Sequence, residues 1–507
     1  MIRLTGHDLT IKDVVAVARR DEPAGLERGA AHAVEAAAKY VRQLAASPEP
    51  VYGVTTGFGD LATVRVSPDD SRQLQRNLVR SHAVGTGDPL PEEVVRAVLL
   101  LRANTLAAGR SGVRTDTIEL LVDMLDRGVV PVVPEHGSVG ASGDLAPLAH
   151  LALVLIGEGE AFYERARVGG GEALRRAGLK PLVLEPKEGL SLINGTQVMT
   201  AIACLALHDA EVLAASADII GAMSAEALRA TDRAWDTKLH QTRPYPGQLR
   251  VAANLRALME GSPIVASHRA NDPRVQDAYS IRCMPQVHGA VRDSLAHVRR
   301  MLEIEINSVT DNPLVFPEVG RVISGGNFHG EPVAIVSDLA TIAVTELADI
   351  SEARIERLMD PHFSNLPPFL TPKPGLNSGL MVAQYGAAAL LTEIRLLATP
   401  ASVHSIPTSA GMEDHVSMGV HAARKFRHAV RLAADVLAIE ALVAAQGLDL
   451  LDLVPAAPVA SARRVVREVS PRLEDDRSLA HDITRIGDLI RSEVLVTAVR
   501  QLVRELA

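Results

Sequence analysis

Apolar residues recur at helical spacing along the second half of the chain. One stripe, with steps of three and four residues, comprises Val336, Leu339, Ala343, Leu347 and Ile350. The run 416–447 contains no proline and predicts an unusually long helix that ends at Gly447. The ranges 205–228 and 380–398 have the same apolar character. No alternating series typical of β-strands stands out, so the pattern predicts a mainly α fold.

Loops separate these predicted helices and are most prominent in the first part of the chain. Glycine- and proline-rich stretches occupy 51–60, 131–147, 308–332 and 359–379. Such loops connect helices, but on a rigid helical frame they also carry chemistry. Loop-rich sequence gives way to long helices near residue 200, so we predict an N-terminal domain of residues 1–200 and a helical domain of residues 201–507. Thr10 followed by Asp13 predicts a capping box at the first helix.

Length and charge narrow the class of protein. With 507 residues the chain exceeds the size of a single core, and 47% hydrophobic with 22% charged residues is ordinary for a globular protein. A net charge of -9, from 52 basic and 61 acidic residues, argues against a surface for nucleic acid or anionic lipid. We therefore expect neither kind of partner.

The cellular setting follows from the cysteines and the apolar segments. Cys204 and Cys283 form no disulfide framework and show no zinc spacing, which favours a reducing compartment. The N-terminus lacks the order of a signal peptide. The longest uncharged apolar stretch, 195–207, is shorter than the roughly 18 residues that a membrane span needs. These features predict a soluble, cytoplasmic protein.

The strongest chemical signal is the glycine-rich segment 137–150, which contains Ala141-Ser142-Gly143. A hydrolase nucleophile elbow at Ser142 would need glycine at position 144, where Asp144 stands. A phosphate-binding loop would need a following Lys-Ser/Thr pair, which is missing. Taken alone, the segment also fits a plain turn in which Asp144 or Ser142 caps a helix.

The segment resembles the signature of the aromatic amino acid ammonia-lyases and aminomutases. Seven further motifs occur in family order, so the resemblance covers the chain from about residue 5 to the C-terminus. They are Tyr52-Gly53-Val54-Thr55-Thr56-Gly57-Phe58-Gly59, Ser81-His82, Leu192-Ile193-Asn194-Gly195-Thr196, residues 276–282, Asp311-Asn312-Pro313, Gly325-Gly326-Asn327-Phe328-His329 and Met412-Glu413-Asp414-His415.

The resemblance implies a prosthetic group made from the chain itself, with no external cofactor. In the family, the nitrogen matching Gly143 attacks the carbonyl matching Ala141, and loss of water, including the Ser142 hydroxyl, leaves a methylidene-imidazolone. Glycine suits position 143 because no Cβ obstructs the approach. The resemblance also implies a long-helix bundle, a homotetramer and active sites assembled from more than one subunit.

Two positions distinguish the substrates within the family. Phenylalanine lyases have apolar residues at the position of His82, while histidine and tyrosine lyases have His. Phenylalanine and tyrosine members have Gln at the position of Glu413, while histidine lyases have Glu. A carboxylate accepts an imidazole N–H, whereas a phenyl ring would leave it unpaired, at a cost of ~1–3 kcal/mol or more. The resemblance therefore implies deamination of L-histidine to trans-urocanate and ammonia.

The remaining family positions receive roles by the same resemblance. Arg282 would hold the substrate carboxylate, because its planar fork matches that group. Tyr52 would take the β-proton, although a phenol with a pKa of ~10 needs its pKa lowered for this. The residues that orient or cover the electrophile are Asn194, Gln276, Tyr279 and Phe328.

Other histidines receive no role from the sequence. His329 and His415 neighbour motif positions, and no cluster has metal-ligand spacing, so no metal is expected.

Some features leave alternatives open. The stretch 410–413 reads Ala-Gly-Met-Glu, where histidine lyases are expected to have Ala-Asn-Gln-Glu. A tyrosine ammonia-lyase or aminomutase with the same electrophile is one alternative, and a non-catalytic helical homologue is another. The intact Ala-Ser-Gly argues against the latter. A lyase of the fumarase type is disfavoured because its Gly-Ser-Ser signature is missing.

Overall fold

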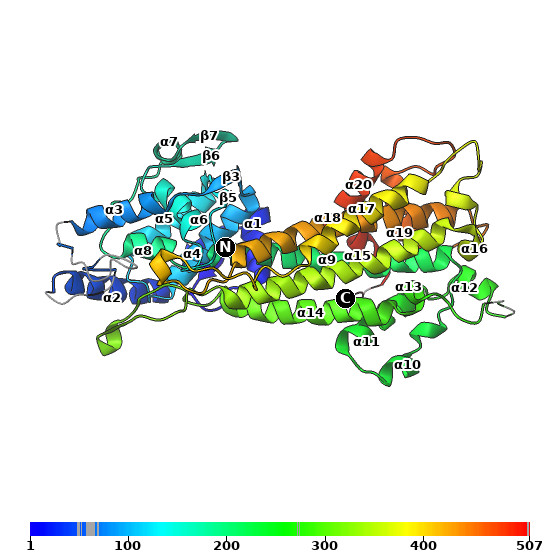
Figure 1. Cartoon of the computed structure of the whole chain (residues 1–507), viewed down its shortest axis with the longest axis horizontal. Helices are drawn as coiled ribbons and strands as arrows, with labels where there is room; N and C mark the ends of the chain where they lie inside the picture. Colours follow the sequence, from blue (N-terminus) through cyan, green and yellow to red (C-terminus); the bar gives the residue numbers. More distant parts are fainter. Residues whose placement is uncertain are drawn as a thin grey trace. The chain divides into compact units, whose positions relative to one another are not determined.

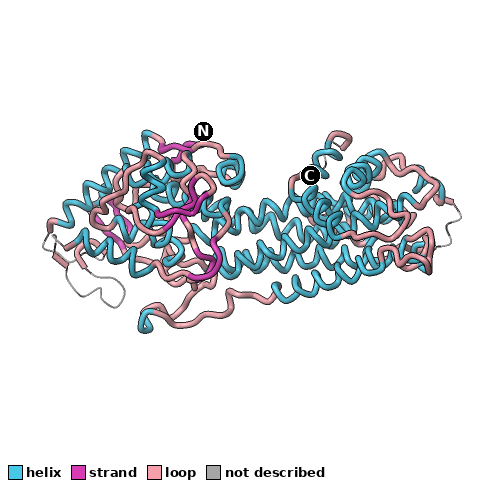
Figure 2. Tube along the Cα trace, turned by 90° about the horizontal axis from the view of Figure 1, so that it is seen from above, coloured by secondary structure: helices cyan, strands magenta, loops and turns pink. Residues whose placement is uncertain are grey.

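The computed structural model of the chain is mainly helical, as the apolar periodicity predicts. It describes residues 1–47, 51, 53–56, 66–67, 70–270, 272, 274–503 and 506. Helices dominate the trace in Figure 2, and the described strands are only two to four residues long. Such strands escape sequence analysis because alternation becomes readable only over about four to eight residues.

Contacts along the chain divide it into two compact units. Unit 1 comprises Met1–Leu205, Arg299–Asp338 and Pro400–Arg424, and unit 2 comprises Ala206–Val298, Leu339–Thr399 and Lys425–Ala507. Unit 1 thus includes two segments beyond residue 200 that the sequence analysis assigned to the helical domain. A single boundary in the sequence cannot represent a chain that returns twice to its first unit.

Unit 1 contains the strands of the described chain and a set of shorter helices. The strands pair as β1 with parallel β2, β3 with β5, β6 with both β4 and β7, and β8 with β9. The elements are β1 (Ile2–Leu4), α1 (Ile11–Arg20), β2 (Ala24–Leu26), α2 (Arg28–Ala45), α3 (Ser71–His82), β3 (Thr86–Pro89), α4 (Glu92–Ala107), α5 (Thr115–Asp126), β4 (Val130–Pro131), β5 (Pro134–His136), α6 (Leu145–Leu155), β6 (Glu160–Tyr163), β7 (Ala166–Gly169), α7 (Gly170–Arg176), α8 (Glu188–Ile193), β8 (Leu314–Phe316), η3 (Pro317–Val319), β9 (Arg321–Ile323) and η5 (Ser409–Gly411).

Unit 2 is helical throughout its described residues. Its own elements are η2 (Arg233–Trp235), α10 (Thr237–Gln241), α11 (Pro246–Leu258), α12 (Pro263–Ser267), α13 (Tyr279–Arg282), α16 (Pro361–Ser364), η4 (Pro368–Leu370), α17 (Met381–Leu397), α19 (Ala457–Val469), α20 (Ala480–Arg491) and α21 (Val494–Arg500). Four long helices, labelled in Figure 1, have residues in both units; these are α9 (Gln197–Ala227), α14 (Met284–Glu305), α15 (Glu331–Met359) and α18 (Gly419–Asp449).

Helix α4 forms the centre of unit 1. Every residue from Val94 to Ala107 is buried, so this helix is enclosed on all sides. It packs against α1, α2 and α5. Its buried Arg96 donates to the carbonyls of Val17 and Leu125. Its buried Arg102 also donates to backbone carbonyls, although its Nε has no partner among the described residues. The core therefore tolerates these charges through hydrogen bonds rather than exposure.

A buried ion pair joins α15 and α18 within unit 2. The Arg354 guanidinium lies 2.6 Å from a Glu440 carboxylate oxygen, and both side chains are fully buried. Ser224 and Ser351 also donate to this carboxylate, each at 2.6 Å. The charges are thus compensated in the interior, where removing one partner would be costly.

The predicted long helix exists, but its end differs from the prediction. Helix α18 continues through Gly447 to Asp449. A Cβ at Gly447 would lie 3.1 Å from the Ala227 Cβ. This glycine therefore permits close packing of α18 on α9 instead of ending the helix. At the N-terminus, the predicted capping box of Thr10 and Asp13 is confirmed.

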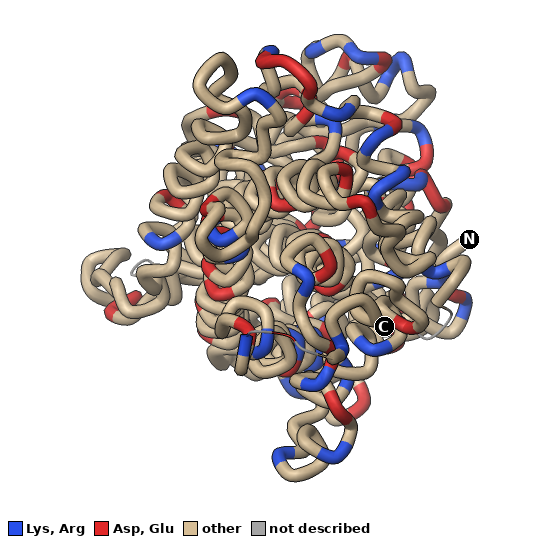
Figure 3. Tube along the Cα trace, turned by 90° about the vertical axis from the view of Figure 1, so that its right-hand side faces the viewer, with Lys and Arg blue, Asp and Glu red and all other residues tan. Residues whose placement is uncertain are grey.

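By length and composition α9 is apolar enough to cross a membrane, but 78% of its most apolar window is buried, which is typical of a core helix. Figure 3 shows acidic and basic segments interspersed along the trace in that view.

Candidate active site

The Ala-Ser-Gly segment lies in a tight loop of unit 1 just before α6. Gly140 and Gly143 have φ values of 72° and 71°, a left-handed conformation that favours glycine. Gly143 forms a parallel bridge with Gly195, and a Cβ at position 143 would lie 2.2 Å from the Gly195 carbonyl oxygen. Position 143 therefore favours glycine over any other residue, both for its backbone conformation and for the lack of space for a Cβ.

Asp144 anchors this loop to the start of α9. One carboxylate oxygen accepts the backbone N–H groups of Val198 and Met199 at 2.8 and 2.9 Å, and the other accepts the Ser138 hydroxyl. The Asp144 N–H donates to the Gly195 carbonyl at 2.7 Å. Burial raises the pKa of this carboxyl to about 7, although its hydrogen bonds act to lower it. Asp144 thus caps a helix, which the sequence analysis had given as one possibility. The capped helix is α9 and not α6, which follows Asp144 directly.

Glu413 directly contacts the central residue of the segment. The Ser142 hydroxyl donates to one Glu413 carboxylate oxygen at 2.9 Å, and the Thr408 hydroxyl donates to the other at 2.8 Å. Thr408 and Glu413 also form an antiparallel bridge. The structure therefore brings together two predicted site residues that are 271 positions apart and holds the acid by its second oxygen.

The segment after Glu413 packs along the same loop. The Met418 N–H donates to the Val139 carbonyl at 2.9 Å, and the Ser417 N–H and hydroxyl reach the Gly140 carbonyl at 3.4 and 3.3 Å. These contacts lie within unit 1 and fix the position of the 413–418 segment over the loop.

Asn194 lies beside the loop next to a buried arginine. It is 4% exposed, and its side-chain oxygen has no hydrogen-bond partner among the described residues. Its carbonyl accepts from the Arg102 guanidinium, which also donates to the side chain of Gln197. Burial lowers the Arg102 pKa to about 10, so this guanidinium stays charged at neutral pH. It places a fixed positive charge beneath the loop.

His82 and Phe328, two further predicted site residues, both belong to unit 1. His82 is the last residue of α3, and its Nδ1 lies 2.9 Å from the Leu78 carbonyl. If Nδ1 carries the proton for that bond, Nε2 is left as an acceptor. Phe328 is half-buried, and its neighbour His329 lies 3.2 Å from the His415 carbonyl through Nε2.

The other predicted residues lie elsewhere in the chain. Gln276, Tyr279 and Arg282 belong to unit 2, where Gln276 and Arg282 line a cavity of about 380 Å³. The Arg282 guanidinium lies over the Tyr279 ring, 4.6 Å from its centroid. The Arg282 Nε is buried without a partner among the described residues, as is the Gln286 side-chain oxygen in the same cavity. Tyr52 lies outside the described residues, so its role stays a prediction.

Sequence reasoning missed three contributors to the site. Asp144 was noted only as a possible cap, and Arg102 and Thr408 were not noted at all. Arg102 follows the apolar run 98–101 in a buried helix, and a charged residue at such a place is the signal that would have marked it. Thr408 carries no such mark, because its role depends on a contact with Glu413 that only the fold creates.

Known proteins resemble this chain over nearly its whole length. The sequence model of the aromatic amino acid lyase family matches residues 9–469. The histidine ammonia-lyase of Myxococcus xanthus (strain DK1622) is 52% identical over 500 residues, which is 98% of either chain. The structure of histidine ammonia-lyase from Trypanosoma cruzi superposes with a TM-score of 0.92 at 42% identity, covering 99% of this chain and 95% of that one. Tyrosine aminomutase from Streptomyces globisporus gives a TM-score of 0.94 at 38% identity, covering 99% and 98%. This chain belongs to the aromatic amino acid lyase family.

Proposed function

We propose that this carbon–nitrogen lyase removes ammonia from L-histidine without oxidation and releases trans-urocanate. The observation that carries the proposal is the Glu413 carboxylate, which is hydrogen-bonded to the Ser142 hydroxyl at 2.9 Å. An acid at this point favours a substrate ring that donates an N–H. The 52% identity to a histidine ammonia-lyase supports the same substrate.

The residues around the loop fit the prosthetic group that the family implies. The left-handed Gly143 leaves no room for a Cβ, and the Ser142 hydroxyl is held by an acid–base group. Asn194 presents a buried amide beside the loop. Ala141, Ser142 and Gly143 would form the methylidene-imidazolone, which supplies an electrophilic carbon that the common side chains lack.

Glu413 and His82 would select the protonated imidazole of the substrate. Glu413 is an acceptor, and a proton on His82 Nδ1, donated to the Leu78 carbonyl, makes Nε2 an acceptor as well. Two acceptors suit a ring with two N–H groups. Protonation of the ring would increase the acidity of the adjacent β-proton, which the base must remove.

The unit 2 residues would hold the other end of the substrate. Arg282 would bind the carboxylate with its guanidinium, and Gln276 and Tyr279 would orient the reacting group. In this proposal Tyr52 is the base for the β-proton. The protein would act as a cytoplasmic homotetramer, with each site built from more than one subunit.

The test is the substitution Glu413→Gln with Asp414→Asn as a matched control. Both changes replace an acid by its amide, but only Glu413 contacts the loop in the described structure. Loss of a hydrogen bond to a charged group corresponds to about 1.5–3 kcal/mol, so kcat/KM for L-histidine should fall roughly 10- to 100-fold in Glu413→Gln. Asp414→Asn should behave like the parent.

Urocanate is followed by its ultraviolet absorbance, with L-tyrosine and L-phenylalanine as parallel substrates. Turnover of L-histidine by the parent, with kcat/KM lowered in Glu413→Gln and not in Asp414→Asn, supports the proposal. Unchanged histidine turnover in Glu413→Gln, or a parent that prefers tyrosine, would overturn the substrate assignment in favour of a tyrosine lyase or aminomutase.

A further inference from the structure

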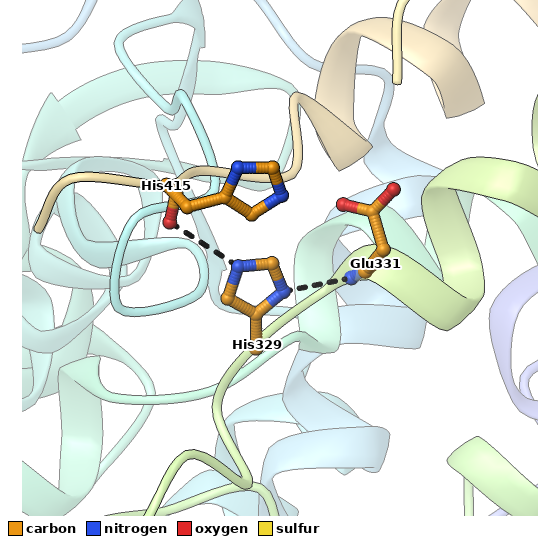
Figure 4. A group of neighbouring side chains, drawn as sticks. All are labelled: His329, Glu331 and His415. Carbon is orange, nitrogen blue, oxygen red and sulfur yellow. Dashed lines mark hydrogen bonds between the residues drawn. The ribbon is translucent and has the colours of Figure 1, made fainter. Parts of the chain in front are cut away.

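We propose that His329, Glu331 and His415 form a binding site for zinc or a related divalent metal ion. Their ligand atoms all lie within 4.8 Å of one another. Figure 4 shows the three side chains converging from two separate segments of unit 1. The sequence analysis expected no metal because His329 and His415 are 86 positions apart, which hides the cluster from any spacing rule.

The elements place each candidate ligand at the edge of a helix. His329 lies in the loop just before α15, and Glu331 is the first residue of that helix. His415 lies in the loop that leads into α18. The two imidazole rings are parallel to within 6°, with centroids 5.7 Å apart. One imidazole nitrogen from each ring and one carboxylate oxygen are thus available from neighbouring backbone segments.

His329 has the hydrogen bonding expected of a metal ligand. Its Nε2 faces the His415 carbonyl at 3.2 Å, so Nε2 carries the proton and donates it. Its Nδ1 therefore keeps a lone pair, which now faces the Glu331 N–H at 3.3 Å, a long and weak contact. Ligating histidines commonly donate their other ring N–H to a carbonyl in this way.

Glu331 supplies an independent reason for a cation at this place. Its Oε2 is buried and has no hydrogen-bond partner among the described residues. A buried carboxylate oxygen without a donor is unfavourable, and a bound cation would provide the missing partner. This observation concerns solvation and does not depend on the distances between the three ligands.

The donor set decides the class of ion. Two imidazoles and one carboxylate match zinc and related divalent ions, while calcium and magnesium prefer oxygen alone. Zinc bonds of roughly 2.0–2.1 Å would draw the three ligands closer together. A fourth position remains for water, and a hollow of about 720 Å³ lined by His329 and Glu331 gives access.

Binding would tie together two segments that carry predicted site residues. Phe328 precedes one ligand, and Glu413 lies two positions before another. The ion would therefore stabilise the local arrangement of both segments, and we expect a higher melting midpoint with zinc. This effect does not require that the substrate assignment be correct.

The experiment measures zinc binding to the full chain after chelator treatment and buffer exchange. Competition with a chromophoric chelator should give one zinc ion per chain. Glu331→Gln and His415→Ala should each weaken binding at least tenfold. The matched controls Glu346→Gln, an exposed acid on the same helix, and His7→Ala should bind like the parent.

X-ray absorption of the zinc-loaded parent provides a readout that needs no variant. A first shell of nitrogen and oxygen at about 2.0–2.1 Å with imidazole scattering supports the site, even if a variant fails to fold. The proposal is wrong if the parent does not compete with the chelator, or if the folded variants bind like the parent. It is equally wrong if only His415→Ala weakens binding, because the ion would then sit on an exposed histidine alone.

Discussion

The substitution Gly143→Ala tests whether the loop geometry is required for the proposed prosthetic group. The backbone at this position has φ +71°, and the new Cβ would lie 2.2 Å from the Gly195 carbonyl oxygen and 2.5 Å from its carbon. Gly128→Ala is the matched control, because Gly128 has φ +67° and no atom within 4 Å of the built Cβ. The two variants share the dihedral strain and differ in the steric clash.

The expected magnitudes follow from these contacts. A left-handed conformation costs an alanine about 1–2 kcal/mol, which is the whole effect at Gly128. At Gly143 a forced shift of packed backbone adds about 1–3 kcal/mol. Moving Gly195 also weakens the 2.7 Å hydrogen bond from the Asp144 N–H, worth about 0.5–1.5 kcal/mol. The total of roughly 3–6 kcal/mol is a large part of the stability of a typical protein.

The assay combines mass spectrometry with thermal unfolding at a fixed scan rate. The parent and Gly128→Ala should show the two-water deficit of the cyclised segment, and Gly143→Ala should lack it and melt lowest of the three. The reasoning is refuted if Gly143→Ala retains the deficit and melts together with Gly128→Ala, because the close approach to Gly195 would then have no consequence.

Three further predictions concern stability and turnover. Because burial raises the Asp144 pKa from 3.8 to about 7, its contribution to stability is present below its unfolded pKa and is lost as pH rises through about 7. Because an amide does not titrate, the free energy of unfolding of Asp144→Asn should fall by roughly 3 kcal/mol less than that of the parent between about pH 5 and pH 8. Lys187→Met should destabilise the chain by about 3–5 kcal/mol, because it leaves Asp311, now 2.8 Å from the ammonium and fully buried, without its partner. Thr408→Val should lower kcat/KM for L-histidine roughly tenfold, because Glu413 loses a hydroxyl donor at 2.8 Å.

Matched controls exist for the buried ion pair and for turnover, and a contrary result is defined for the Asp144 titration. For the buried pair, Arg175→Gln breaks an exposed ion pair with Glu172 and should change stability by under about 0.5 kcal/mol. For turnover, Thr392→Val removes an exposed hydroxyl that donates to the Ala388 carbonyl in its own helix, and kcat/KM should not change. Parallel pH profiles for the parent and Asp144→Asn, measured by melting midpoint, would contradict the assigned titration.

Structural features that depend on residues only a few positions apart could be predicted from the sequence. The capping box of Thr10 and Asp13 is readable because both partners lie in one turn. The long helix α18 is readable because its apolar residues repeat with the period of the helix. The Ala-Ser-Gly segment and each family motif are short contiguous runs, so the loop and Glu413 could be predicted as site residues from the sequence alone.

Tertiary structure decided which distant groups meet. Ser142 and Glu413 are 271 positions apart, and nothing local to either residue indicates that they share a hydrogen bond. Asp144 caps α9 rather than the adjacent α6 because the loop folds back across Gly195. Gly447 lies inside its helix and packs closely on α9, where a built Cβ would be 3.1 Å from the Ala227 Cβ.

Features that could be predicted differ from those that could not in the range of the interactions that create them. Helix periodicity and capping are set by backbone geometry over one or two turns, so they are encoded in short stretches of sequence. The pairing of Lys187 with Asp311, or of His329 with His415, depends on how buried surfaces bring separate segments together. By itself the sequence determined the helices and the chemistry of the loop, while the folded chain determined which side chains surround it.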